Sequence, residues 1–145
     1  MLVITIFFSF IVSVGAKFLA DQFLTDRIAI IGSFIGLQHA TNRGVAFSIQ
    51  FPGILQNLLI TVALIAVCVL ALRSATSSLR CIAFGMIIGG AVGNIVDRIP
   101  DGLVTDFIQV GTFPIFNVAD SCITIGVVLL LVEVVYNHKN SQNLK

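Results

Sequence analysis

Charged residues are scarce in this chain of 145 residues. They make up only 10% of the sequence, whereas 57% of the residues are hydrophobic. A soluble globular domain normally carries about 25% charged residues, so the shortage excludes an ordinary soluble domain and indicates an integral membrane protein. The formal net charge is +1, with no basic run and no alternation of basic and aromatic residues. The sequence therefore gives no sign of nucleic-acid binding.

Residues that bind metals or form disulfides are also few. Cys68, Cys81 and Cys122 lie in apolar stretches without the spacing of a metal site, which is typical of small buried apolar side chains. His39 has no histidine or cysteine nearby, and the second histidine, His138, lies in the C-terminal tail. We therefore expect no metal, no other cofactor and no disulfide framework.

Long apolar stretches dominate the rest of the chain. They cover residues of about 2–20, 54–72, 81–97 and 117–136. Each is long enough to cross a bilayer as a helix. No positive residue precedes the first stretch, so we interpret it as a retained helix rather than a cleaved signal peptide. The polar tail after Tyr136 is expected to be disordered.

The segment 21–52 differs from the apolar stretches around it. Its apolar runs are short, rich in β-branched residues and separated by glycines, which predicts a small sheet on the membrane surface. The segment between the last two stretches is expected to be a loop. The predicted fold is therefore a single all-α membrane domain, 1–145, with four transmembrane helices and a small extracytoplasmic β-sheet between the first two.

Small and basic residues refine this plan. Gly85, Gly89 and Gly93 recur every four residues in the third stretch, and such spacing lets helices pack closely in lipid. Arg73 and Arg80 flank a short loop without acidic residues between the second and third stretches. Basic loops tend to be cytoplasmic, so we expect this loop and both termini in the cytoplasm, and the intervening polar segments outside.

Acidic residues number only seven, and four of them lie close together, Asp97, Asp101, Asp106 and Asp120. Carboxylates are costly near a bilayer, so such a group is a functional hypothesis by default. Two adjacent carboxylates cannot both ionise cheaply; one stays protonated while the other acts as a base, as in aspartic proteases. We therefore interpret Asp106, after a loop, and Asp120, at the start of a helix, as a protease site.

The competing interpretation is that these acids form structural ion pairs with Arg98, Arg43 or Lys17. We assign Asp97 to that structural class because Arg98 is adjacent, and we expect Asp101, in a turn beside Gly102, to be solvated. Lys17 lies near the end of the first stretch. Its long side chain can reach the interface by itself, or it can orient groups of the site or lipid phosphate.

Several tracts resemble the motifs of the bacterial lipoprotein signal peptidases, the type II signal peptidases. The tracts are NRGVAF, GGAVGNIVDR, DGLVTDFI and FPIFNVAD, in the order found in that family. The resemblance implies an aspartic endopeptidase, without a cofactor, in the bacterial cytoplasmic (inner) membrane, with its active site at the outer face. Such an enzyme removes the signal peptide of a prolipoprotein before a cysteine that carries a diacylglyceryl group.

The same resemblance implies roles for single residues. By motif, the catalytic aspartates are Asp106 and Asp120, and the residues that contact substrate or inhibitor are Asn42, Asn94, Arg98, Asn117 and Lys17. The implied partners are prolipoproteins, membrane lipids and the cyclic peptide antibiotics that block such enzymes, and we expect a monomer. One motif departs from the family, which has Asp-Gln-x-x-Lys in its first helix. If Lys17 is that lysine, Ser13 and Val14 stand at the other positions, although an Asp21-Gln22 pair follows.

Two other classes of protein compete with a peptidase. A small transporter or channel subunit also has glycine stripes and intramembrane acids, but its essential carboxylate should lie near the middle of a span. A non-enzymatic assembly protein or chaperone that binds through the surface sheet gives no reason for two acids around FPIFN. Both alternatives therefore explain less of the sequence than a peptidase does.

Overall fold

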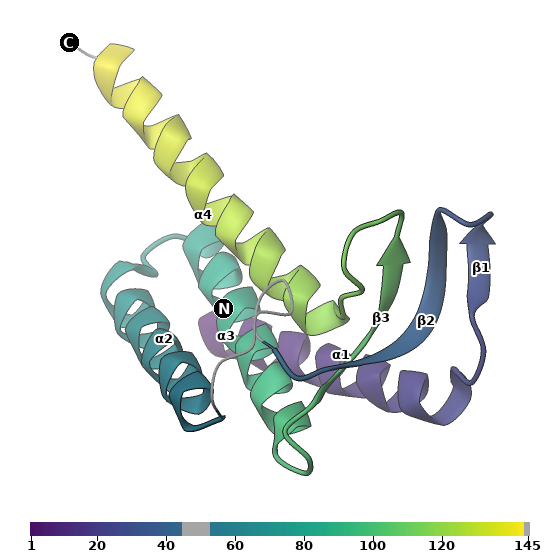
Figure 1. The fold of residues 1–145 in the computed structure, drawn as a ribbon. Helices are drawn as coiled ribbons and strands as arrows, with labels where there is room; N and C mark the ends of the chain where they lie inside the picture. The colour runs from purple at the N-terminus through teal and green to yellow at the C-terminus, as the bar shows by residue number, and fades with distance from the viewer. Residues whose placement is uncertain (45–52, 144–145) are drawn as a thin grey trace.

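The computed structural model describes residues 1–44 and 53–143, and this part of the chain forms four helices and three strands. The helices are α1 (Leu2–Phe23), α2 (Gly53–Ser74), α3 (Ser78–Arg98) and α4 (Val118–Asn143). The strands are β1 (Ile28–Ile31), β2 (Ile35–Asn42) and β3 (Val104–Val110). All four helices are long and apolar enough to cross a membrane (Figure 1). The predicted fold class, four membrane helices with a small sheet, is therefore confirmed.

Helix α3 is the centre of the bundle. In its most apolar window 44% of the residues are buried, against 11% in each of the other three helices. The predicted glycine stripe explains this position, because its members face α1 at Thr5, Ile6, Ser9 and Ser13. A Cβ atom on Gly89 would lie only 2.6 Å from the carbonyl oxygen of Ile6. The two helices therefore pack backbone to backbone, as small residues allow in lipid.

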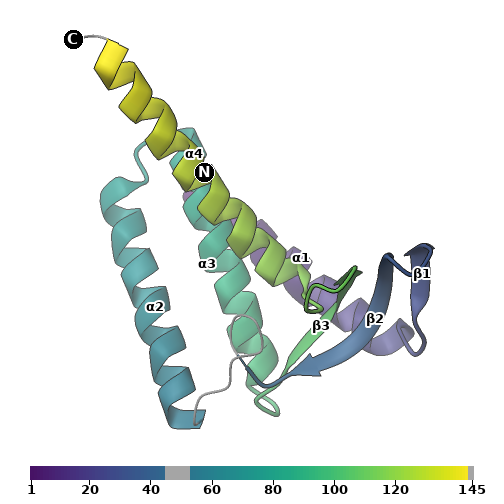
Figure 2. The same ribbon diagram turned by 45° about the horizontal axis from the view of Figure 1, so that its top comes forward.

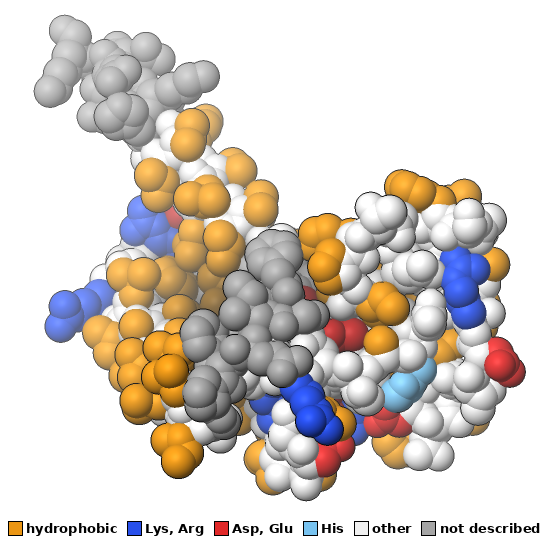
Figure 3. Space-filling view, viewed as in Figure 1, with side chains coloured by type: hydrophobic (Ala, Val, Ile, Leu, Met, Phe, Trp, Pro, Cys, Tyr) orange, Lys and Arg blue, Asp and Glu red, His pale blue; other side chains and the backbone are white. Residues whose placement is uncertain are grey.

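Helix α2 stands at the side of the bundle and contacts it through α3 (Figures 1 and 2). Ala71, Phe84 and Ile88 form the buried apolar cluster between these two helices. Large apolar side chains elsewhere on α2 and α4 are exposed, and Figure 3 shows them covering the helical part of the molecule. In a membrane protein such surfaces face lipid tails, so their exposure agrees with the helices being membrane spans.

The sheet is antiparallel with the strand order β1-β2-β3. Strand β3 comes from the segment between α3 and α4, so the expectation of a plain loop there is wrong. The sequence VTDFIQV becomes a strand because it pairs with β2, which lies far away in the sequence. An apolar cluster of Ala20, Leu24 and Phe107 fixes the sheet against the end of α1. The sheet therefore combines both polar segments at one end of the bundle.

The C-terminal tail differs from its expected structure, and part of the tract NRGVAF lies outside the described residues. The tail expected to be disordered continues α4 as far as Asn143. It contains no glycine or proline to end the helix, so the apolar helix before it extends into polar residues. Residues 45–52, with Val45–Phe47 of the tract NRGVAF, lie outside the described residues.

Candidate active site

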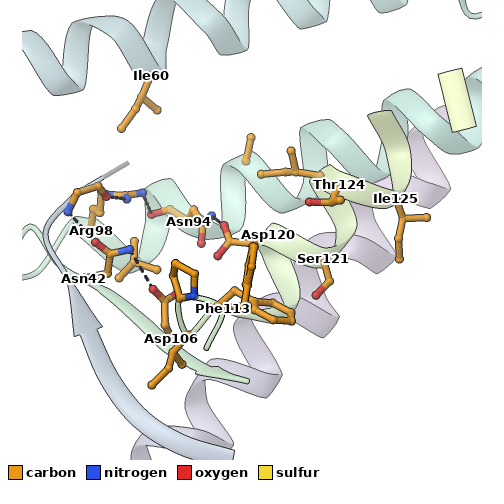
Figure 4. A pocket seen from close by; sticks show the side chains of 17 residues that line it. Asn42, Ile60, Asn94, Arg98, Asp106, Phe113, Asp120, Ser121, Thr124 and Ile125 are labelled. Carbon is orange, nitrogen blue, oxygen red and sulfur yellow. Dashed lines mark hydrogen bonds between the residues drawn. The ribbon is translucent and has the colours of Figure 1, made fainter. Parts of the chain in front are cut away.

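Four elements bring polar side chains together where the sheet meets the bundle. Strand β3 supplies Asp106, α4 supplies Asp120, α3 supplies Asn94 and Arg98, and β2 supplies Asn42 (Figure 4). In the space-filling view, acidic side chains lie near this junction, away from the apolar surface of the helices (Figure 3). The candidate site therefore lies at the end of the bundle rather than within its apolar middle.

Asp106 is almost completely buried, with 3% of its surface exposed. Successive side chains of a strand point to opposite faces, so Asp106 and its neighbour Thr105 face different sides of β3. Asn42 donates a hydrogen bond of 3.0 Å to Asp106 Oδ2, and Asn117 donates one of 2.9 Å to Oδ1. Asn42 is itself fixed because its Oδ1 accepts the N–H of Gly44. The carboxyl group of Asp106 is therefore held by amide donors on both oxygens.

Asp120 belongs to the capping structure of α4. The side chain of Asn117 accepts the N–H of Asp120 at 2.9 Å, and Asp120 Oδ2 accepts the N–H of Asn117 at 3.3 Å. This reciprocal arrangement is a capping box. The other oxygen, Oδ1, accepts a bond of 2.8 Å from Asn94. Because a helix N-terminus favours an acidic side chain, the local structure itself explains why an aspartate fits here.

Asn117 connects the two carboxyl groups directly. Its Nδ2 donates to Asp106 Oδ1 at 2.9 Å and to Asn94 Oδ1 at 3.0 Å, while its Oδ1 accepts the backbone N–H of Asp120. The carboxyl group of Asp120 is bound by the backbone N–H of Asn117, at 3.3 Å from Oδ2. The side chain of Asn117 is buried, and its three side-chain bonds fix its orientation, since an amide has one accepting and one donating end. One residue therefore sets the relative placement of Asp106 and Asp120.

The two acids differ in their environment. The pKa of Asp106 is raised from 3.8 to about 6; burial is the largest cause and the negative charge of Asp120 adds to it, whereas Asn42, Asn117 and Arg98 act in the opposite direction. Desolvation disfavours the charged form of a carboxyl group. Asp106 therefore keeps its proton to a higher pH than an ordinary aspartate does.

Arg98 closes the site on the side of β2. Its guanidinium donates to the carbonyl oxygen of Gly44 at 2.7 Å and to that of Asn94 at 3.3 Å. Its Nε is buried and has no hydrogen-bond partner among the described residues. Arg98 thus holds the end of β2 against α3 and places a positive charge near both acids.

Both acids line a cavity of about 630 Å³, called here the large cavity. It continues from the acids along Ser121, Thr124 and Ile125 of α4 and is bounded on the other side by Ile60 of α2 (Figure 4). A segment after β3, Phe113 to Phe116, forms another wall. Ligand sites are commonly mostly apolar cavities with a few convergent polar groups, and this cavity has that composition.

Most of the predicted site residues meet here. Asn42, Asn94, Arg98, Asp106 and Asp120 line the large cavity, and Asn117 contacts both acids. Among the described side chains, those of residues 1–44 and 54–137, no three His, Cys, Asp or Glu come together as a metal site would require.

Lys17, the remaining predicted residue, lies at a second, smaller cavity of about 210 Å³. Its ammonium is 2.7 Å from Asp21 and 3.2 Å from Asp97. The structural assignment of Asp97 therefore agrees with its contacts, but its partner is Lys17 and not the adjacent Arg98. Asp101 is exposed and accepts the N–H of Leu103 in a turn, as expected.

Three residues near the site were missed by the sequence reasoning. Asp21, Thr105 and His39 form a hydrogen-bonded group in which Asp21 Oδ1 accepts from Thr105 and contacts His39 Nε2. A first-helix carboxylate is therefore present, one turn after Lys17 rather than at Ser13. The i,i+4 spacing of Lys17 and Asp21 was the available signal.

Comparison with known proteins gives the same picture over nearly the whole chain. Residues 5–136 match the family model described as signal peptidase (SPase) II. A lipoprotein signal peptidase of Dehalococcoides mccartyi is 40% identical over 146 residues, which cover 89% of this chain and 91% of that protein. One of Chlorobium luteolum is 42% identical over 132 residues, or 79% of each chain.

A solved structure of a bacterial membrane enzyme is also similar. It superposes with a TM-score of 0.86 at 28% sequence identity, and the match covers 96% of this chain and 90% of that one. The arrangement of helices and sheet is therefore shared with a membrane enzyme.

Proposed function

This chain belongs to the signal peptidase II family, and on that premise we propose that Asp106 and Asp120 are the catalytic pair with which it cleaves lipoprotein signal peptides. It is a membrane lipoprotein signal peptidase, a protease of a family whose class is aspartic. The alternative of a transporter or channel subunit is not favoured, since the relatives of this chain are lipoprotein signal peptidases. The observation that carries the proposal is the link through Asn117, whose side-chain amide binds the Asp106 carboxyl group and whose backbone N–H binds that of Asp120, at one cavity.

The proposed chemistry needs one protonated and one charged carboxyl group. Asp120 takes a proton from water, whose oxygen attacks the scissile carbonyl carbon, while Asp106 gives its proton to the carbonyl oxygen. The resulting tetrahedral intermediate collapses as the C–N bond breaks. The leaving nitrogen receives the proton held by Asp120, and one hydroxyl of the intermediate returns its proton to Asp106 as the carboxylic acid product forms. The raised pKa of Asp106 supports giving it the acid role.

We propose two tasks for the polar residues around the pair. Asn42, Asn94 and Asn117 hold the acids through hydrogen bonds that the structure contains, and they also face the substrate backbone. Arg98 keeps a buried Nε without a partner among the described residues, and we assign it to a substrate carbonyl.

The large cavity suits a lipid-modified substrate. Its apolar part between Ile60 and Ile125 would accept the diacylglyceryl group or the apolar part of the signal peptide, and a cyclic peptide antibiotic would occupy the same space. Membrane lipid would surround α1, α2 and α4 at their exposed apolar faces. We further propose that the enzyme acts as a monomer, with both termini in the cytoplasm and the catalytic pair at the outer face.

The test is cleavage by the purified protein in detergent. A prolipoprotein that carries diacylglyceryl on its cysteine should release an intact signal peptide, and the new N-terminus should be the modified cysteine. The same prolipoprotein without the lipid is the matched control and should remain uncut. Cleavage at another bond, or equal cleavage of the unmodified control, would refute the proposed substrate.

A further inference from the structure

Lys17 of α1 lines the small cavity and not the large one, but its contacts connect it to the strand that carries Asp106. Its ammonium bridges two carboxylates, Asp21 from its own helix at 2.7 Å and Asp97 from α3 at 3.2 Å. The Asp97 side chain is only 10% exposed. A single cation therefore joins two helices through acids that are not part of the site described above.

Both of these acids bind the same residue, Thr105. Asp97 Oδ2 accepts the backbone N–H of Thr105 at 2.7 Å, and Asp21 Oδ1 accepts its hydroxyl at 3.1 Å. Thr105 is buried and immediately precedes Asp106 in β3. The residue before the catalytic acid is thus held at its main chain and at its side chain by two carboxylates that share one lysine.

The geometry of β3 explains why holding Thr105 also places Asp106. Alternate side chains point to opposite faces of a strand, and here Thr105 lines the small cavity while Asp106 lines the large one. Strand β3 is the edge of the sheet. On its outer edge the N–H of Thr105 binds Asp97, and the N–H of Phe107 binds the carbonyl oxygen of Phe116. Asp106 therefore sits between two anchored main-chain groups.

Charge makes the lysine necessary to this arrangement. Asp21 and Asp97 converge on one threonine, and two carboxylates that share a site repel each other. The ammonium between them offsets this repulsion and lets both accept hydrogen bonds from Thr105. Without it, relaxation of either acid would release the strand on the side opposite Asp106.

We propose that Lys17 is a positioning residue for Asp106, acting through Asp21, Asp97 and Thr105, and not a residue that contacts the substrate. The proposal rests on Asp106 being catalytic, as proposed above. Lys17 keeps β3 rotated so that the Asp106 carboxyl group faces the large cavity. Loss of Lys17 therefore affects the turnover of bound substrate more than the binding of substrate.

The test compares Lys17→Met with Lys17→Arg as purified enzymes acting on a diacylglyceryl-modified prolipoprotein in detergent. Lys17→Met should lower kcat by about 10- to 100-fold, the cost of a small misplacement of a catalytic group, and should leave KM within about twofold of the wild type. Lys17→Arg keeps the charge and should recover most of kcat. Arg27→Met is the matched control, since it removes a cation bonded to Gln109 farther along β3, and it should turn over normally.

A second pair of variants covers the case in which Lys17→Met does not fold. Thr105→Val removes only the hydroxyl that binds Asp21 and should lower kcat by about 3- to 10-fold, the value of one hydrogen bond, whereas Thr105→Ser should keep it. Equal kcat for these two variants would overturn the proposal. So would a raised KM at unchanged kcat in Lys17→Met, because that result marks a substrate contact.

These outcomes are distinguishable from a failure of the proposed function. If the wild type does not cleave the prolipoprotein, or if Asp106→Asn cleaves it well, the catalytic pair itself is wrong. If the wild type cleaves, Asp106→Asn is inactive and Lys17→Met has the kcat of the wild type, only the positioning role is refuted.

Discussion

At the scale of single residues, the site depends on one amide. Asn117 caps α4, orders Asn94 and binds Asp106, so it couples the start of a helix to a strand. No single partner accounts for its conformation; the three bonds together do, since each uses a different lone pair or N–H. The geometry of the proposed catalytic pair is therefore built from the same hydrogen bonds that begin the last transmembrane helix.

The first prediction concerns the pH dependence of activity. Asp106 has its pKa raised to about 6, and its proposed role requires the proton. The kcat/KM of the wild type, which reports ionisations of the free enzyme, should therefore fall as the pH rises above about 6. Because the two acids interact, the apparent pKa at which kcat/KM falls belongs to the pair and not to one residue. A kcat/KM that rises steadily from about pH 6 to pH 8 would contradict Asp106 as the acid.

The second prediction concerns stability. The pKa of Asp106 is higher in the folded protein than its ordinary value of 3.8, so between these values the folded state binds more protons than the unfolded one. Stability from this group is full below about 3.8 and is lost as the pH rises through about 6. Asp106→Asn cannot titrate, so its Tm relative to the wild type should increase from about pH 4 to pH 7.

Exposed Asp101 provides the control for that measurement. Asp101→Asn removes a carboxylate from a surface turn, and its Tm difference from the wild type should change little over the same pH range. If the Tm difference from the wild type were equally independent of pH for Asp106→Asn and Asp101→Asn, burial would not control the ionisation of Asp106.

The residues of the site were largely predictable from the sequence, whereas the contacts between helices that hold them in place were not. Asp106, Asp120 and Asn94 stand in recognisable tracts, and an acid in an apolar sequence attracts notice by its cost alone. The Lys17–Asp97 contact could not be predicted, because it joins two helices and depends on how α1 is rotated against α3. Sequence neighbourhood favoured Arg98 as the partner, but a neighbouring helical residue points about 100° away on the helix.

At the scale of elements, the packing of α1 on α3 decides where the site can form. The glycine stripe was visible as a spacing of four, and helix periodicity places such residues on one face. Strand β3 was not visible, because its pairing with β2 is non-local and its sequence carries Asp106 and Gln109. Local sequence patterns therefore predicted the helices well, but they identified only one of the two segments that form the sheet.

The third prediction tests the stripe. Gly89→Ala would place its Cβ 2.6 Å from the carbonyl oxygen of Ile6 and 2.7 Å from the Ser9 Cβ. Overpacking of this kind typically costs about 1–3 kcal/mol, so the Tm in detergent should fall clearly. Gly15→Ala is the matched control, because a Cβ at that position of α1 has no atom within 4 Å. A Tm for Gly89→Ala equal to that of Gly15→Ala would show that the helices are not in close contact.

At the scale of the whole molecule, polar functions are divided between the two ends of the bundle. The sheet and the acid pair occupy one end, where α1 and α3 finish and α4 begins. At the other end, Arg80 pairs with Glu133 at 2.9 Å and connects α3 to α4 beside the short α2–α3 loop. Because the helices between these two ends cross the membrane, the two ends lie on opposite sides of it.

The fourth prediction assigns those sides. In a variant with Cys68, Cys81 and Cys122 replaced by alanine, a cysteine at exposed Thr76 should resist a membrane-impermeant thiol reagent in intact cells. A cysteine at exposed Ser33, between β1 and β2, should react, because the loop with Arg73 and Arg80 is expected inside. Reaction at position 76 together with protection at position 33 would invert the topology.

The most direct test of the central assignment is cleavage by Asp106→Asn and Asp120→Asn, each measured beside the binding of a cyclic peptide inhibitor. Asparagine neither takes a proton from water nor gives one to a carbonyl oxygen, so each variant should lose at least the roughly 100- to 10,000-fold that acid–base catalysis contributes. The double variant should be no slower than either single one, and all three should still fold and bind the inhibitor. Substantial cleavage by either single variant would contradict the assignment of Asp106 and Asp120 as the catalytic pair.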